Sequence, residues 1–152
     1  MAKYATQTSV SSELSRIEIE KLLIKYGASN FAYATAQGMA MIAFSMCNRN
    51  VKFVLDMPKS SEFNLTPSGR LRSVNSQKDA YEQACRQRWR ALKLVIQAKL
   101  EAVECGISIF EDEFMAHIVL PDGRTVKEYV APQIEAAYNT GRVPALLPGF
   151  DD

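Results

Sequence analysis

The stretch from Gln77 to Glu104, QKDAYEQACRQRWRALKLVIQAKLEAVE, decides how the rest of the chain is interpreted. It lies in the longest run without Gly or Pro, and most of its residues favour helices. We therefore predict one long central helix over residues 77–104, ended by Gly106.

A helix of this sequence has an apolar and a charged side. At about 100° per residue, the apolar residues gather on one broad face, as expected for a helix packed on a core. The expected face comprises Tyr81, Cys85, Leu92, Val95, Ile96 and Val103, with Trp89 and Leu100 at its border.

Two cations interrupt this expected apolar face. Arg88 and Lys99 are eleven residues apart, close to three helical turns, so they project in nearly the same direction. One interpretation is that each pairs with a carboxylate from elsewhere, for which Glu111, Asp112 and Glu113 are candidates. The other is that they line an inward-facing anion site for a phosphate or a nucleotide.

The net charge of +1 hides a strong asymmetry along the chain. Residues 70–99 contain eight basic and two acidic residues, whereas residues 100–152 contain ten acidic and three basic ones. The two regions either pair with each other or leave a basic surface for a charged partner. The predicted residues for binding nucleic acid or another anion are Arg70, Arg72, Arg86, Arg90 and Lys93.

Three strand-like runs precede the central helix. Residues 30–35 and 51–57 alternate apolar with other residues, whereas residues 39–46 are apolar on both faces, which predicts the middle strand. Short turns between the runs predict an antiparallel meander. Residues 58–76 then form a long loop rich in Ser and Thr, and loops of this length are often functional.

The remaining helices are predicted from their capping signals. Three Ser/Thr residues are each followed three positions later by Glu, which is the pattern of a capping box. We expect short helices over residues 15–26, 109–117 and 126–139, the first ending before Gly27 and the last at Gly141. Their capping boxes pair Ser15 with Glu18, Ser108 with Glu111, and Thr125 with Glu128.

These elements predict a single α+β domain over residues 1–152. A three-stranded antiparallel meander is packed by the long central helix, with a short N-terminal helix and two C-terminal helices. We expect residues 1–14 to be loosely attached and residues 142–152 to form a tail. The order helix–strand–strand–strand–helix is similar to that of double-stranded-RNA-binding domains, whose sequence motif is absent.

The cysteines and the N-terminus indicate a cytoplasmic protein. The three cysteines are odd in number and form no CxxC pair, which favours free thiols in a reducing compartment. Residues 1–12 are polar and no apolar run approaches the length of a membrane span, so we expect neither a signal peptide nor a membrane partner.

Motifs for chemistry are sparse. His117 follows Glu113 by four residues, which would place both on one helix face, but no HExxH or His/Cys cluster accompanies them. GxSxG, GxGxxG and Walker motifs are also missing. We therefore predict no catalytic residue, metal or cofactor, and the sequence favours a binding protein over an enzyme.

Several segments resemble a small, uncharacterised protein family that is common in tailed-bacteriophage and prophage genomes. The segments are AKYATQTSV, SRIEIEKLLIKYGAS, QACRQRWRALKLVIQAKLEAVECGI, FEDEFMAHIVLPDGRTV and PQIEAAYNTGRVPALLPG. The resemblance implies a phage protein in the cytoplasm of the bacterial host, and it carries no activity or catalytic residues with it.

Two functions agree with these observations. The first is a non-enzymatic accessory protein that binds nucleic acid through the basic central helix. The second is a counter-defence or host-takeover protein that binds a host protein or a signalling nucleotide. A long helix with Trp89 at the edge of its apolar stripe suits a homodimer as well as a monomer, so the sequence leaves that choice open.

Overall fold

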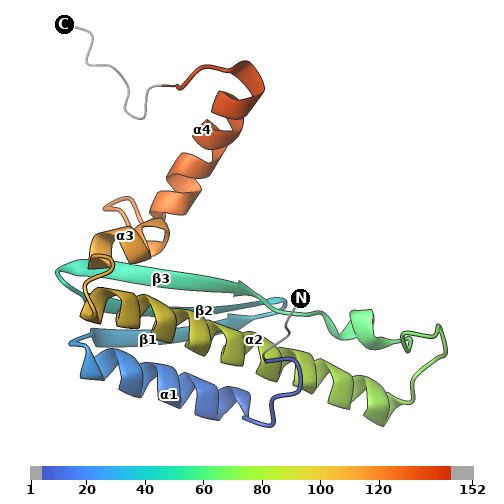
Figure 1. The fold of residues 1–152 in the computed structure, drawn as a ribbon. Coiled ribbons are helices and arrows are strands. Elements are labelled where there is room, and N and C mark those ends of the chain that lie inside the picture. The colour runs from blue at the N-terminus through green and yellow to red at the C-terminus, as the bar shows by residue number, and fades with distance from the viewer. Residues whose placement is uncertain (1–4, 145–152) are drawn as a thin grey trace, which may run out of the picture.

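The computed structural model describes residues 5–144 and has the predicted α+β architecture (Figure 1). An N-terminal helix precedes the three strands, the long helix follows them, and two shorter helices end the described chain. The helices and strands are α1 (Ser12–Lys25), β1 (Ser29–Ala36), β2 (Met39–Met46), β3 (Arg49–Asp56), α2 (Val74–Glu104), α3 (Phe110–Phe114) and α4 (Val126–Thr140), with 3-10 turns η1 (Ser60–Phe63) and η2 (Met115–His117).

The strands form an antiparallel meander in the order β1-β2-β3, as predicted. Two-residue turns join them at Gln37–Gly38 and Cys47–Asn48. Gly38, Cys47 and Asn48 have φ values of 75°, 50° and 57°, the left-handed conformation that tight hairpins require. β2 is the central strand, which explains why its sequence is apolar on both faces.

Helices α1 and α2 cover one face of this sheet (Figure 1). The core lies between the two layers and is centred on Phe44, which contacts the rings of Phe31, Phe53 and Phe114. The sheet contributes to this core through Ala40, Ile42, Phe44, Met46, Val51 and Phe53.

The buried face of α2 is rotated from the one that the sequence predicted. The buried residues of the helix are Trp89, Leu92, Ile96 and Leu100. Trp89 and Leu100, predicted at the border of the apolar face, are therefore part of its buried centre. Val95 is 46% exposed, and Arg88 is exposed rather than central to an apolar face. The prediction placed Val95 on the face and Trp89 and Leu100 at its border, whereas the large Trp and Leu side chains gain more free energy from burial than Val does.

The first described residues are attached more firmly than predicted. Ala5 is buried, and the side-chain amide of Gln83 donates hydrogen bonds to the carbonyls of Thr6 and Thr8 at 3.1 and 2.9 Å. Helix α1 begins at Ser12, where the Ser11 hydroxyl accepts a hydrogen bond from the amide of Leu14. The predicted capping box at Ser15 is wrong, because Ser15 lies within the helix rather than at its start, and its side chain is buried.

The C-terminal elements pack on β3 and on the end of α2. The predicted helix over residues 109–117 is shorter, and its box at Ser108 is wrong because Ile109 occupies the cap without a side-chain hydrogen bond. The Thr125–Glu128 capping box and the left-handed Gly141 are confirmed. Helix α4 extends away from the two layers (Figure 1), and most of the predicted tail, residues 145–152, lies outside the described chain.

We expect Phe44→Ala to lower the free energy of unfolding by about 3–5 kcal/mol, since it removes a buried ring from the centre of the core. The matched control, Val95→Ala on the outer side of α2, should change it by less than about 0.5 kcal/mol. Urea denaturation of the two variants measures both values. Equal costs would contradict the rotated position of the α2 face.

Candidate nucleic-acid interface

The structure separates the predicted binding residues of α2 into different environments. Arg90 forms a salt bridge with Glu18 of α1 and is only 24% exposed, so it does not belong to an outer surface. Arg86 donates two hydrogen bonds to the side-chain oxygen of Gln83, at 3.1 and 2.6 Å. Lys93 donates to Gln97 at 2.6 Å on the exposed side of the helix. These three cations therefore do not form one continuous surface.

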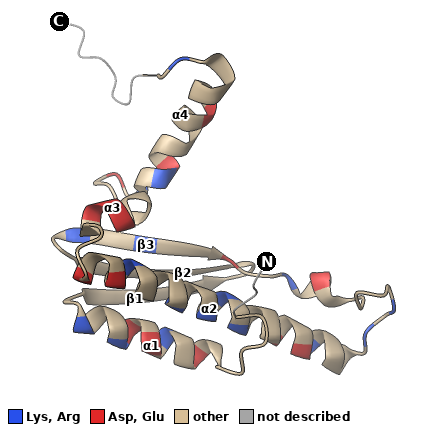
Figure 2. Ribbon diagram, viewed as in Figure 1, with Lys and Arg blue, Asp and Glu red and all other residues tan. Residues whose placement is uncertain are grey.

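The inward-facing site predicted from Arg88 and Lys99 is not formed. Arg88 is exposed, whereas the Lys99 ammonium donates to the backbone carbonyl of Glu113 at 2.7 Å and lies 3.7 Å from its carboxylate. Lys99 is thus neutralised by the fold itself, which was one of the two interpretations of the sequence. Figure 2 shows the acidic residues of α3 near the C-terminal end of α2.

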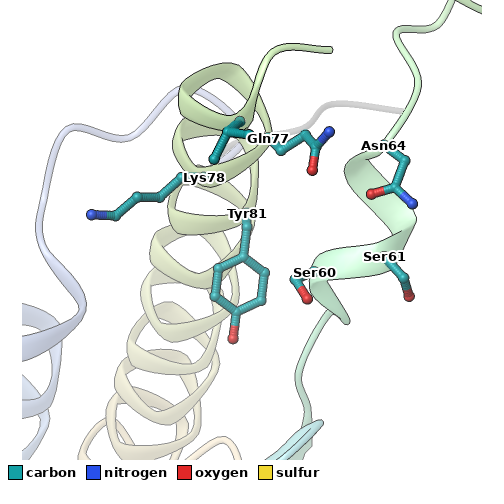
Figure 3. A pocket seen from close by; sticks show the side chains of 7 residues that line it. Ser60, Ser61, Asn64, Gln77, Lys78 and Tyr81 are labelled. Atoms are coloured by element: carbon teal, nitrogen blue, oxygen red, sulfur yellow. The ribbon is translucent and has the colours of Figure 1, made fainter. Parts of the chain in front are cut away.

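A cleft lies at the opposite end of α2, between its first turns and η1 (Figure 3). We call it the loop–helix cleft. Its volume is about 430 Å³. Figure 3 shows Asn64 and Gln77 facing each other across it, with the Tyr81 ring beside Ser60. The lining residues are Ser60, Ser61, Asn64, Val74, Gln77, Lys78 and Tyr81.

Backbone hydrogen bonds hold the loop that forms one wall of this cleft. The amide of Arg72 donates to the carbonyl of Asn64 at 2.8 Å, and that of Thr66 donates to the carbonyl of Arg70 at 2.7 Å. The Arg72 guanidinium also donates to the Leu65 carbonyl at 3.2 Å, so Arg72 stabilises the loop. Arg70, by contrast, is exposed near this end of α2.

Tyr81 is an aromatic residue that lines both the loop–helix cleft and a neighbouring hollow. Its ring packs edge-on against Phe63 of η1, with the ring centres 6.2 Å apart. It also borders a second hollow of about 570 Å³, whose other lining residues include Gln37, Gly38 and Lys59. The two hollows place Lys59 and Lys78 near one partly exposed aromatic ring, and this is the combination that base stacking and phosphate contacts require.

The ionisable groups of this region do not favour nucleophilic chemistry. A side-chain hydrogen bond with Cys85 raises the pKa of Tyr81. Burial raises the pKa of Cys85 itself, so its thiol is a poor source of the reactive thiolate at neutral pH. Residues 5–144 contain no group of three or more His, Cys, Asp or Glu side chains able to hold a metal ion.

Sequence reasoning found the loop but missed its polar residues that line the cleft. Ser60, Ser61 and Asn64 carry no motif, and the unusual length of the loop was the signal that pointed to them. Tyr81 was placed on the predicted apolar face of the helix, yet it is only half-buried, at the cleft wall. The reason is that α2 extends beyond the sheet, so its first turns have no core to pack on (Figure 1).

No protein-family model, curated protein or solved structure matches the chain. None of the helices described is both long enough and apolar enough to cross a bilayer.

His117 stacks on Phe53 instead of pairing with Glu113. Their ring centres are 4.0 Å apart, and burial, together with Lys99 and Lys127, lowers the pKa of His117. The unfolded chain therefore binds this proton more readily, so stability should fall as the pH drops below about 6.5, the usual histidine value.

We expect His117→Phe, which keeps a stacked ring, to weaken this loss of stability between pH 7 and pH 5. Urea denaturation of both proteins across this range measures the difference. At pH 8, the reference, the side chain at position 117 is uncharged in both proteins, folded or unfolded. An unchanged pH dependence would contradict the buried, neutral state of His117.

Proposed function

We propose that this chain is a non-enzymatic accessory protein that binds single-stranded nucleic acid at the loop–helix cleft. The observation that carries the proposal is the position of Tyr81 in the wall of a cleft that also presents Ser, Asn and Gln side chains, with Lys59 and Lys78 on either side of the ring. The resemblance to a phage family agrees with such a role, because small phage proteins often act in DNA replication or recombination. It agrees equally with a role against host defences.

The chemistry of the cleft suits a base and its phosphates. An aromatic ring stacks any base, while Ser, Asn and Gln side chains offer both donors and acceptors to its edge. Lys59, Arg70 and Lys78 are exposed and suited to contact phosphates. The volume of about 430 Å³ is within the range of small-ligand sites.

The charge of the region suits modest, salt-sensitive affinity. Glu62 and Asp79 lie among the cations, and Lys78 is 4.0 Å from Glu82. With about three phosphate contacts on a single strand, the logarithm of the affinity should fall with the logarithm of the salt concentration with a slope of about −2.

We expect Tyr81→Ala to weaken binding of a labelled single-stranded oligonucleotide by about 5- to 150-fold, the usual loss for one stacked base. Tyr81→Phe should retain most of the affinity because it keeps a flat aromatic ring. Fluorescence anisotropy at low and moderate salt measures both. Arg70→Ala should lower both the affinity and the salt slope, since it removes a phosphate contact.

Lys21→Ala is the matched control, because Lys21 is an exposed cation on α1. It should leave binding unchanged. Absence of binding at low salt, or equal losses for Lys21→Ala and Arg70→Ala, would contradict the proposal. A mononucleotide that competes as well as the oligonucleotide would favour a nucleotide ligand instead.

A second candidate is binding to a host protein through α1. The outer side of this helix exposes three large apolar residues, Leu14, Ile17 and Ile24, at 46%, 48% and 54%. Exposed apolar groups of this kind commonly mark protein contacts. A host protein that is retained after nuclease treatment, and lost with Ile17→Glu, would favour this function over nucleic-acid binding.

A further inference from the structure

The face of the sheet opposite α1 and α2 has an unusual composition. Antiparallel sheets with one covered face normally carry polar residues on the other. Here most of the outward side chains are Ala, Met or Val, and the charged ones are Lys52 and Asp56. We call this the open sheet face. It comprises Ala32, Ala34, Ala36, Met39, Met41, Ala43, Ser45, Asn50, Lys52, Val54 and Asp56.

The open sheet face is accessible over its apolar part. Met39 and Val54 are each 45% exposed, and the three alanines of β1 are exposed. Pairing places Ala34 opposite Met41 and Ala36 opposite Met39. Small alanine side chains on β1 therefore lie beside the methionines of β2. Because the alanines are short, a helix could pack close to the backbone of β1.

The same chain carries a helix that needs such a surface. Within the described residues, α4 has no buried residue. Its larger apolar side chains recur every four positions at Val130, Ile134 and Tyr138, and the last two are 52% and 87% exposed. An isolated helix of 15 residues is only marginally stable in water, so this stripe gains stability from a partner.

The base of α4 is fixed in a direction that leads away from its own sheet. The amide of Val119 donates to the carbonyl of Asn50 at 2.7 Å, which ties the segment to β3. The amide of Val126, the first residue of α4, donates to the carbonyl of Ile118 at 2.9 Å. Only the first turn of α4 lies beside β3, where Lys127 and Glu128 border a hollow with Lys52 and Val54. The rest of the helix extends away from the sheet (Figure 1).

We propose that two copies of this chain form a reciprocal dimer in which α4 of each copy packs on the open sheet face of the other. The dimensions agree, because 15 helical residues span about 22 Å and strands of 8 residues span about 26 Å. The central strand β2 contributes only Met39, Met41, Ala43 and Ser45 to the open sheet face, and the charged residues of that face, Lys52 and Asp56, lie on the edge strand β3.

The size of the contact sets the expected affinity. A helix of this length and about 10 Å in width covers about 220 Å² of sheet. Two such contacts, counted on both surfaces, bury on the order of 900 Å² in total, which is at the low end for a specific complex. A contact of this size is typical of weak, reversible association, so the dimer should form only as the protein concentration rises.

Sedimentation velocity over a micromolar concentration series tests this dimer. We expect a monomer–dimer equilibrium, weakened at least tenfold by Ile134→Glu. The matched control is Ile24→Glu, because Ile24 is also an isoleucine on a helix surface and is 54% exposed against 52% for Ile134. Ile24→Glu should leave the equilibrium unchanged, and circular dichroism should show that both variants are folded.

A mixing experiment tests the reciprocity. Ala34→Arg blocks the open sheet face, and Ile134→Glu blocks the helix, so neither variant should dimerise alone. One contact of the mixed dimer uses an unaltered helix on an unaltered face, so at equal total concentration the mixture should associate more than either variant alone, though less than the unaltered protein. A monomer at every concentration for the unaltered protein, a dimer lost with Ile24→Glu but kept with Ile134→Glu, or a mixture that at the highest concentration associates no more than its two components would each overturn the proposal. Tyr81→Ala should not affect dimerisation, so this test is independent of nucleic-acid binding.

Discussion

The packing of one stripe of α2 on one face of the sheet is the constraint on which the other features depend. Trp89, Ile96 and Leu100 lie against the layer that contains Ile42 and Phe44, and together they fix how α2 is rotated. With that rotation, Arg90 is directed to Glu18 in α1 and Lys99 to Glu113 in α3. The cations that dominate the sequence of the helix are therefore divided between structural pairs and exposed positions.

The architecture could be predicted because its signals are local. The short turns between strands, the run 39–46 that is apolar on both faces and the Thr125–Glu128 box each specify nearby backbone. The meander, its central strand and the box agree with the structure. The rotation of α2 could not be predicted as well, because it depends on which side chains find partners in other elements. Arg88 and Lys99 share a direction on the helix. Within residues 5–144 Lys99 pairs with the carboxylate of Glu113, 14 residues along the chain, whereas Arg88 is exposed. The cleft likewise joins residues of the loop and of α2 that no motif connects.

The length of α2 explains why a candidate site exists at all. Its C-terminal half packs in the core, while its first turns extend beyond the sheet and face the loop and η1 (Figure 1). Polar residues and a half-buried tyrosine can occur there because these turns do not pack on the hydrophobic core. The same one-sided packing leaves the other face of the sheet uncovered, so the proposed ligand site and the proposed dimer contact both follow from a single two-layer arrangement.

The central claim is that the function of this chain lies at the loop–helix cleft and not along the middle of α2. Backbone amide chemical shifts during titration with a single-stranded oligonucleotide test it most directly. We expect the largest changes in residues 59–64 and 70–81, with small changes around Arg86, Arg88 and Lys93. Changes concentrated around these three cations, or no changes at low salt, would contradict the claim.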